Sequence, residues 1–567
     1  MTIRVEALYC CLMATTLLAL DGCGSHHSSS SSSSSSGTGS GYSVGGTISG
    51  LDEGGLVLQN GKDLLSESTN IAFTFPTLLP TGTAYDVQVV QQPSGQTCLV
   101  TNATGTMSTT SVTNVAVVCG QWAWRAGSDT PGATGNYGTV DVLATTNVPG
   151  ARSYAASWTD SSSNFWLFGG GLNHSTVSVS GQFNDLWLWD FNASEWEWVS
   201  GSNTPNAPGN YGTLNVPSTT NVPGARFGAT TWIDSTNRLW LFGGEENISA
   251  GNVVQFNDLW MFNPLVNGGE WTWVGGSSSP NAAGVYGTEG TPDVGNAPGA
   301  RAGAISWIDS AGNLWLYGGY CYSESGGTAG TCSGTFNDLW KFSPASSEWT
   351  WVSGSDVTGA AGSYGTQGTA AAGNVPGART AANAWTDQSG KLWLFGGTTT
   401  IPGSAGGAGT TDLNDLWSFD PATSEWTWQS GSQTSGAPSV YGQQGIAAKT
   451  NVPGARDSGT AWTDTSGNFW LFGGQLTNSG TTTLYGDVWL YRSASGEWMW
   501  VGGATTPNAS AVYGSLGVAA LANTPGGRAA AANFIDGHGN PWLFGGTVGG
   551  GAEFLNDLWQ YVTAPTP

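Results

Sequence analysis

The stretch PGARFGATTWIDSTNRLWLFGG, residues 223–244, contains the pattern that decides the fold of this chain. It opens with Pro-Gly-Ala-Arg, runs through a segment of small residues to Trp-x-Asp, turns, and ends in an aromatic segment closed by two glycines. The same arrangement returns at intervals of 72 to 78 residues, so the chain is built from repeated units. The arginines of the six copies are Arg152, Arg226, Arg301, Arg379, Arg456 and Arg528, the last after Pro-Gly-Gly.

One more motif follows each Gly-Gly pair, and in the first five units a second motif comes after it. A variable segment leads to Asn-Asp-Leu-Trp, as at residues 257–260, and then to Trp-x-Trp, as at residues 271–273; residues 486–489 carry the variant Gly-Asp-Val-Trp. Aromatic and β-branched segments separated by Gly-rich turns predict four short strands in each unit. The glycine pairs are Gly169-Gly170, Gly243-Gly244, Gly318-Gly319, Gly396-Gly397, Gly473-Gly474 and Gly545-Gly546.

These units resemble the kelch repeat, in which a double glycine, the aromatic strand after it and a spaced Trp in the last strand recur. The resemblance covers residues 121–562 and departs from the family in length, since kelch units span about 50 residues. It implies an all-β fold in which six units form a six-bladed β-propeller.

The two ends of the repeat region are out of phase. Residues 121–124, Gln-Trp-Ala-Trp, stand alone before the first Arg, whereas the last unit stops near Tyr561 without its own Trp-x-Trp. We therefore expect residues 121–126 to supply the fourth strand of the last unit, because such pairing closes the ring and removes exposed sheet edges. Residues 563–567 remain as a short tail.

Composition and charge exclude several classes of protein. The 567 residues include 38 acidic and 14 basic side chains, for a formal net charge of −24. This surface repels phosphate backbones and excludes nucleic-acid binding. Aromatic residues make up 11% of the chain, which argues against disorder.

The N-terminus is typical of an export signal. Residues 1–22 contain Arg4 and an apolar stretch too short to span a membrane, which predicts a signal peptide. Residues 20–23, Leu-Asp-Gly-Cys, resemble the lipobox of bacterial lipoproteins, which implies lipidation of Cys23; Asp21 departs from that motif. Cleavage and secretion without a lipid is the alternative. Residues 23–41, rich in Ser and Gly, are expected to form a flexible linker.

Residues 42–120 are predicted to form a small β-sandwich of immunoglobulin-like type that acts as a spacer. The expected strands are 42–51, 56–59, 71–75, 85–91, 97–101 and 112–118. Four cysteines remain beyond the signal region, and their local spacing predicts the disulfides Cys98–Cys119 and Cys321–Cys332. Such pairing fits an oxidising compartment. No spacing suited to zinc is present.

The repeated side chains are interpreted as structural rather than catalytic. Tryptophans at equivalent positions predict a core between neighbouring units. The six arginines could ring a channel and bind a carboxylate ligand, but one structural ion pair per unit is the preferred interpretation. Its acidic partner could be the Asp of Asn-Asp-Leu-Trp or, in five units, the Glu before Trp-x-Trp (Glu195, Glu270, Glu348, Glu425 and Glu497). The Asp-rich turns, such as residues 160–164, are interpreted as hairpin turns rather than calcium loops.

Antiparallel topology brings the second-to-third and the unit-to-unit connections to one end of each sheet. Variable sequence is concentrated there, where binding surfaces are commonly built. The least repetitive stretches are 171–183, 245–256, 320–336, 398–413, 475–485 and 547–555.

Two functions fit this pattern. The preferred one is a non-enzymatic recognition module, exported and held at the outer membrane or cell surface by a lipid, that binds a protein or glycan on its long-loop face without a cofactor, metal or catalytic residue. The alternative is an exported carbohydrate-modifying enzyme, similar to the oxidase or mutarotase propellers, with its site at the channel mouth. The copper chemistry of galactose oxidase needs two adjacent histidines, and His174 and His538 are expected on opposite faces.

Overall fold

The computed structural model describes residues 41–563, apart from residues 53, 94–95, 173–180, 250–251, 267, 322–331, 400–410 and 551–552. The described residues form strands and turns without a helix, which confirms the all-β prediction. None of them forms a helix suited to crossing a membrane. The predicted signal peptide at residues 1–22, Cys23, the linker up to residue 40, His174 and residues 564–567 lie outside the described residues.

Residues 42–119 form two four-stranded sheets. One has the order β4-β1-β8-β6, in which β1 and β8 run parallel, and the other has the order β3-β2-β5-β7. Their strands are β1 (Val44–Ser49), β2 (Leu56–Asn60), β3 (Asp63–Glu67), β4 (Ala72–Thr74), β5 (Ala84–Gln91), β6 (Cys98–Thr101), β7 (Thr104–Thr106) and β8 (Val112–Cys119).

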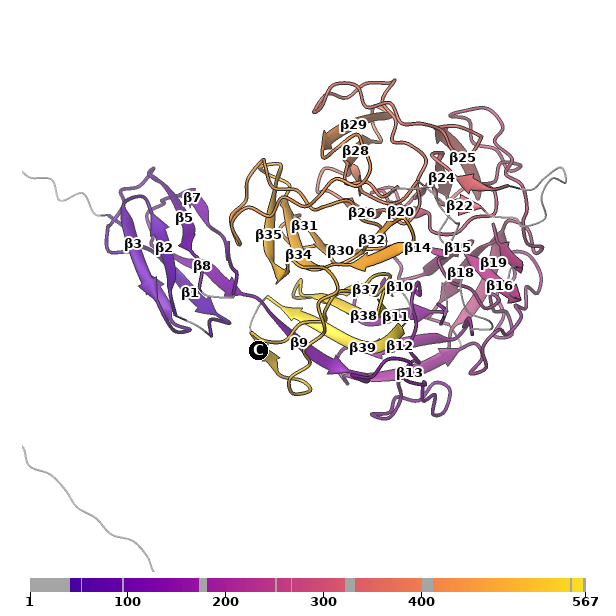
Figure 1. Cartoon of the computed structure of the whole chain (residues 1–567), viewed down its shortest axis with the longest axis horizontal. Helices are drawn as coiled ribbons and strands as arrows, with labels where there is room; N and C mark the ends of the chain where they lie inside the picture. Colours follow the sequence, from indigo (N-terminus) through magenta and orange to yellow (C-terminus); the bar gives the residue numbers. More distant parts are fainter. Residues whose placement is uncertain are drawn as a thin grey trace, which may run out of the picture. The chain divides into compact units, whose positions relative to one another are not determined.

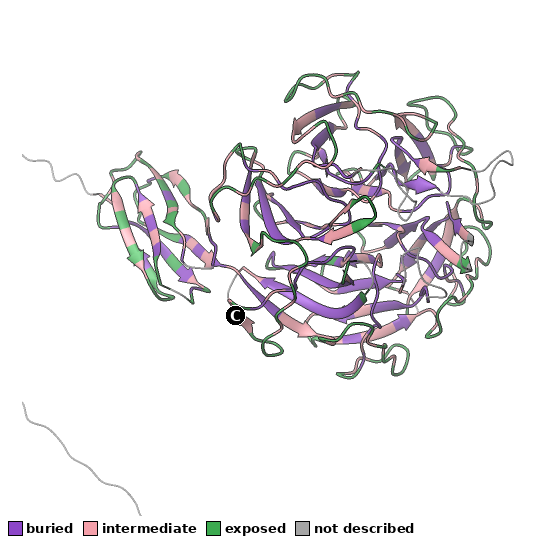
Figure 2. Ribbon diagram, viewed as in Figure 1, coloured by how far each residue is buried: buried purple, intermediate pink, exposed green. Residues whose placement is uncertain are grey.

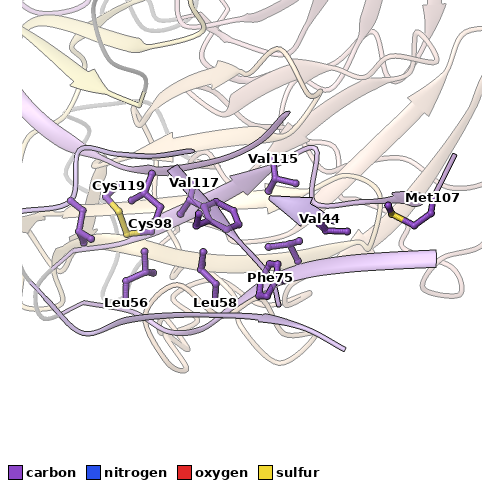
Figure 3. Close-up of a cluster of buried hydrophobic side chains, with 13 residues drawn as sticks. Val44, Leu56, Leu58, Phe75, Cys98, Met107, Val115, Val117 and Cys119 are labelled. Atoms are coloured by element: carbon purple, nitrogen blue, oxygen red, sulfur yellow. A yellow bond between two sulfur atoms is a disulfide. The ribbon is translucent and has the colours of Figure 1, made fainter. Parts of the chain in front are cut away.

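The two sheets share one apolar core. Alternate side chains of β2, such as Leu56 and Leu58, are fully buried against Val117 of β8 (Figure 3). Cys98 and Cys119 face each other across β6 and β8 and are joined by a disulfide. Because one face of each sheet is buried, the register of these strands is strongly specified.

Strands β3 and β7 were not expected from the sequence. β3 carries Asp63, Ser66 and Glu67 and no fully buried residue, and β7 has only three residues, Thr-Gly-Thr. Both lie at sheet edges, where pairing is made by the backbone and leaves little hydrophobic pattern in the sequence.

Beyond Gly120, the described residues form six repeat sheets, numbered here 1 to 6 in chain order (Figure 1). Sheets 1 to 5 are four-stranded and antiparallel, with consecutive units side by side. Sheet 1 contains β10 (Ala156–Thr159), β11 (Phe165–Phe168), β12 (Leu186–Asp190) and β13 (Glu195–Ser200). Sheet 2 contains β14 (Thr230–Ile233), β15 (Leu239–Phe242), β18 (Leu259–Asn263) and β19 (Glu270–Gly275). Sheet 3 contains β20 (Ile305–Ile308), β21 (Leu314–Tyr317), β24 (Leu339–Ser343) and β25 (Glu348–Ser353). Sheet 4 contains β26 (Asn383–Thr386), β27 (Leu392–Phe395), β28 (Leu416–Asp420) and β29 (Glu425–Ser430). Sheet 5 contains β30 (Thr460–Thr463), β31 (Phe469–Phe472), β34 (Gly486–Arg492) and β35 (Glu497–Ala504).

Sheet 6 combines the two ends of the repeat region. It contains β37 (Ala532–Ile535), β38 (Pro541–Val548), β39 (Glu553–Val562), β9 (Gln121–Ala126) and β36 (Ala519–Ala520), in the order β36-β9-β39-β38-β37. Strands β9 and β39 lie side by side although they are distant in the chain (Figure 1). Trp124 pairs with Trp559, as Trp-x-Trp pairs with Asn-Asp-Leu-Trp in the other sheets.

Tryptophans and leucines fill the space between neighbouring sheets, where the strands are mostly buried (Figure 2). The indole of Trp158 in sheet 1 donates to the carbonyl of Trp240 in sheet 2 at 3.2 Å, and equivalent bonds link the later sheets. Trp189 occupies the slot that Phe262 has in sheet 2 and is 3% exposed. These contacts confirm that the repeated tryptophans form a core between units.

A ring of backbone hydrogen bonds closes around the common axis of the six sheets. It is made by the second residue after each repeat Arg, and we call it the axial belt. Each amide donates to the carbonyl of the equivalent residue in the preceding sheet, at 2.8–3.0 Å, and the Tyr154 amide completes the ring by donating to Ala530. The first strands of neighbouring sheets also contact one another in a closed cycle. The belt residues are Tyr154, Gly228, Gly303, Ala381, Ser458 and Ala530.

The antiparallel order places the second-to-third and the sheet-to-sheet connections at the same end of every sheet, which we call the loop end. Three of the second-to-third connections contain hairpins where the sequence suggested only variable loops. Their strands are β16 (Glu245–Ser249) with β17 (Asn252–Gln255), β22 (Tyr320–Cys321) with β23 (Gly334–Thr335), and β32 (Gln475–Asn478) with β33 (Thr481–Leu484).

Candidate functional site

Each repeat Arg forms a buried, bidentate ion pair with the Asp of the third strand. In sheet 2, Arg226 Nη1 and Nη2 donate to the two carboxylate oxygens of Asp258 at 2.7 and 2.9 Å, and Nη1 also donates to the Gly243 carbonyl. Neither side chain of the pair is more than 1% exposed. The other pairs are Arg152–Asp185, Arg301–Asp338, Arg379–Asp415, Arg456–Asp487 and Arg528–Asp557.

Further donors complete this arrangement, which we call the Arg–Asp module. Asp258 accepts from the Tyr211 hydroxyl at 2.6 Å and from the Trp260 indole at 2.7 Å. Burial lowers the pKa of Arg226, but the adjacent carboxylate outweighs burial and keeps that pKa above its ordinary value. The guanidinium therefore stays charged, and its hydrogen-bonding capacity is used inside the protein.

The glycine pairs belong to the same modules. Gly243 and Gly244 have φ angles of 65° and 98°, which disfavour any residue with a Cβ. A Cβ on Gly243 would lie 2.6 Å from the Arg301 carbonyl oxygen of the next unit. The other five pairs share these positive φ angles. The twelve glycines thus allow close backbone approach between units and contribute no side chain to a ligand site.

The cysteines and histidines do not form a metal centre in the described part of the chain. Cys321 and Cys332 are joined by a disulfide at the loop end. His538 lies in the turn between β37 and β38, at the opposite end of sheet 6. No group of three His, Cys, Asp or Glu side chains suited to a metal occurs among the described residues.

The loop end of the axis is where the six units differ in chemistry. Three positions lie side by side in each unit, as in the bridges Phe227↔Glu245 and Glu245↔Gln255. The first is the residue after Arg, the second is the residue after Gly-Gly, and the third is two residues before the Asn, or Gly486, that opens the third-strand motif. At the first of these three positions only Asp457 is acidic, and at the second only Glu245 is. Aligning the six copies at these positions would have singled out both acids, which the sequence interpretation missed.

Glu245 is held in a largely neutral environment. Its Oε2 accepts from the Tyr320 hydroxyl at 2.7 Å, from sheet 3, and from Gln255 Nε2 at 2.9 Å. Burial raises the pKa of Glu245 to about 6, although these two hydrogen bonds favour the charged form. A carboxyl group of this kind exchanges its proton close to neutral pH.

Asp412 and Asp457 form a second acidic group, from sheets 4 and 5. The two side chains belong to residues that are 1% and 4% exposed, and Asp412 accepts from the Thr477 amide at 2.8 Å. Burial first, and the neighbouring charge of Asp412 second, raise the pKa of Asp457 well above its ordinary value. The environment therefore favours the protonated form of Asp457, and a protonated carboxyl group can both donate and accept hydrogen bonds.

Tyr154 is the large side chain of the axial belt, where the other five positions hold Gly, Ala or Ser. Its hydroxyl reaches Ser458 of sheet 5 at 2.9 Å, and its ring lies beside Phe227 with centroids 6.3 Å apart. Burial raises the pKa of Tyr154, and the nearby Asp457 raises it further. The loop end of the axis thus combines neutral hydroxyls, aromatic rings and carboxyl groups.

The comparisons agree with this repeat structure. Residues 210–427 match the KLHDC2/KLHL20/DRC7 Kelch-repeats domain. The solved structure of YjhT is 14% identical, with a TM-score of 0.43, and the alignment covers 74% of this chain and 95% of that chain. No curated protein matches. The match within residues 210–427 agrees with the sequence-based resemblance to the kelch repeat.

Proposed function

We propose that this kelch-repeat protein is a non-enzymatic recognition module that binds a protein or glycan at its loop end. One observation supports the proposal. The side chains that are the same in every unit form the Arg–Asp modules and the core, whereas residues that occur in a single unit lie at the loop end of the axis. Side chains that vary on a shared scaffold are what ligand selection requires.

The architecture we propose is a six-bladed propeller at residues 121–562, closed by β9 and preceded by an immunoglobulin-like sandwich at residues 42–120. The six sheets, the axial belt and the pairing of β9 with β39 support it. Deleting residues 1–126 removes β9 and exposes the edge of β39. We expect an insoluble product or a much lower melting temperature, and unchanged melting would contradict the closure.

We further propose an exported lipoprotein at the outer membrane or cell surface, with residues 1–22 as signal peptide, Cys23 as the lipidated residue and residues 23–41 as linker. The two disulfides in the described chain support an oxidising compartment. Labelled palmitate should be incorporated by the wild type and not by Cys23→Ser. Equal labelling of both would favour a secreted or periplasmic protein without a lipid.

A binding screen tests the recognition function directly. The full chain is applied to a glycan array and to a panel of cell-surface proteins, and each hit is repeated with Ile248→Arg, which alters an exposed side chain of the β16–β17 hairpin at the loop end. The matched control is Ser162→Arg, in an exposed turn at the opposite end. We expect binding to be weakened at least tenfold only by Ile248→Arg. If Ile248→Arg and Ser162→Arg changed binding to the same extent, the ligand would not bind at the loop end.

An exported carbohydrate-modifying enzyme is the second candidate, favoured by buried carboxyl groups at the loop end whose pKa values are raised. Asp457, paired with Asp412, and Glu245 have the raised pKa values that general acids need. Incubation with the glycans that bind, followed by mass spectrometry, would reveal turnover. Turnover abolished by Asp457→Asn, with the fold intact, would replace the recognition proposal.

A further inference from the structure

Gln182 in sheet 1 has an unsatisfied amide nitrogen at the loop end. Its residue is 1% exposed, and its Oε1 accepts from the Asn247 amide at 3.0 Å. A backbone N–H can only donate, so the Gln182 side-chain atom that faces Asn247 must be the oxygen. The other atom of the Gln182 amide group is therefore the nitrogen, Nε2. Among the described residues, Nε2 has no hydrogen-bond partner. A buried donor left unpaired is costly, so its presence calls for an explanation.

Sheet 2 shows what such an amide binds. Gln255 holds the position equivalent to Gln182, and its Nε2 donates to the carboxylate of Glu245. The residue paired with Gln182 is Gly171, which has no side chain. Sheet 1 therefore presents the donor of this pair without its acceptor.

A side-chain carbon can be added at Gly171 without a clash. A Cβ built there would lie 3.4 Å from Gln182 Cγ and 3.6 Å from Phe227 Cδ1, which is ordinary contact distance. The Phe227 ring is the one that lies beside Tyr154. Gly171 therefore lies between Gln182 and the Phe227 ring, and Tyr154 beside that ring donates to or accepts from the Ser458 hydroxyl.

A second polar atom at the same end is also unpaired. Thr547 follows Gly-Gly in sheet 6, as Gly171 does in sheet 1, and its Oγ1 is buried without a partner. The neighbouring repeat arginines are fully engaged in their modules. The free hydrogen-bonding capacity at this end is therefore neutral, and the charged groups around it are carboxyls.

We propose that the loop end of the axis between sheets 1 and 2 binds an uncharged, hydroxyl-rich ligand, namely a sugar ring. A ligand hydroxyl would accept from Gln182 Nε2 at the place that the Glu245 carboxylate occupies in sheet 2, and other hydroxyls would donate to carboxyl and hydroxyl oxygens nearby. Phe227 and Tyr154 would pack against the apolar face of the ring. This inference rests on the proposed recognition function and narrows it.

Charge and hydrogen bonding separate this class from the alternatives. An anionic ligand would place its charge near Glu245, Asp412 and Asp457, which is unfavourable in a partly buried site. An ammonium group would suit the carboxyls but offers no acceptor for Gln182 Nε2. A hydroxyl both donates and accepts, so it satisfies both sets of groups.

The test uses the full chain and a fixed set of probes. Glucose, galactose, mannose, N-acetylglucosamine and their neutral oligosaccharides are compared with glucuronate as the anion and glucosamine as the cation, by saturation-transfer NMR and calorimetry. Gly171→Gln places a side-chain amide beside Gln182, where it can accept the bond and occupy the space. We expect this variant to weaken neutral-sugar binding at least tenfold and to keep the wild-type melting temperature.

Gly373→Gln is the matched control, since Gly373 is exposed and nothing lies within 4 Å of an added Cβ. Gln182→Leu removes the donor, so it should weaken binding of the same neutral sugars, and glucuronate should still not bind. Neutral-sugar binding that is unaffected by both Gly171→Gln and Gln182→Leu would overturn the inference and leave the recognition function standing. Binding of only a protein or only a charged glycan would also overturn the inference while leaving the recognition function in place. No binding at all would contradict both.

Discussion

The Arg–Asp modules and the loop-end positions lie a few residues apart in sequence, yet the six units treat them differently. Arg, Asp, Tyr, Trp and the glycine pair recur in all six modules with the same bonds, as in Arg226–Asp258 and Arg379–Asp415. The residue directly after each Arg is Ser, Phe, Ala, Thr, Asp or Ala. The backbone around these residues stays the same, because the axial belt closes with one hydrogen bond per unit.

The difference separates side chains that repeat with the packing from side chains that vary between units. An ion pair required for packing must recur wherever the packing recurs. Under the proposed recognition function, a ligand would meet the axis from one end, and the side chains that contact it would have no reason to be alike. Glu245, Asp457 and Tyr154 each appear at their position in a single unit.

Breaking one module should give the largest effect. Arg226→Met removes a guanidinium whose partner, Asp258, is fully buried, and an unpaired buried carboxylate costs about 3–5 kcal/mol. We expect a loss of that size in the free energy of unfolding, measured by urea denaturation with an unchanged m-value.

The double variant Arg226→Met with Asp258→Leu serves as its control. Removing both charges should recover part of the loss, because a buried ion pair contributes little beyond its apolar replacement. Arg301→Met should cost as much as Arg226→Met, since the two modules have the same bonds. Very different losses would show that the modules are not equivalent.

Replacing a loop-end acid should change the pH dependence of stability, because its ionised form, unlike that of a module Asp, is disfavoured in the native state. The native pKa of Glu245 is raised to about 6 from an ordinary 4.5, so the protonated native form is favoured. Its contribution to stability is fully present below about pH 4.5 and is lost as the pH rises through about 6. Relative to Glu245→Gln, the wild type should lose about 2 kcal/mol between about pH 4 and pH 7.

Denaturation of both proteins across this pH range measures the difference directly. Asp457→Asn should show the same direction, because the pKa of Asp457 is also raised. A wild type that gained stability relative to Glu245→Gln with rising pH would contradict the environment described for this carboxyl.

A single hydrogen bond within a module should matter less. Tyr211→Phe removes the hydroxyl that donates to Asp258, and Asp258 keeps Arg226 and Trp260 as partners. We expect a cost of about 1–1.5 kcal/mol. Tyr286→Phe in the next unit should give the same value within error, and a clear difference between the two would sharpen where the modules diverge.

The sequence predicted what repeats and missed what does not. The units, their four strands and the buried tryptophans follow from motifs repeated six times. Strands β3 and β7 were missed because edge pairing is made by backbone atoms that leave no side-chain pattern. The loop-end acids were missed because Asp412 and Asp457 are 45 residues apart and meet only where two sheets adjoin. The repeat pattern along the chain does not show which side chains of neighbouring sheets, such as these two, come into contact.

The axial belt offers the finest test of the comparison, since its backbone is shared and its side chains are not. Ala530 and Ala381 have φ angles of 55° and 54°, whereas Gly228 and Gly303 hold the same conformation without a Cβ. In Ala530→Gly, relief of the left-handed strain, about 1 kcal/mol, should nearly offset the greater freedom of glycine in the unfolded chain. The same two terms act with reversed sign in Gly228→Ala, so we expect a change in unfolding free energy of about 0.5 kcal/mol or less for either variant. A clearly larger loss in Ala530→Gly than in Gly228→Ala would show that the Ala530 side chain, rather than the shared backbone, supports the ring.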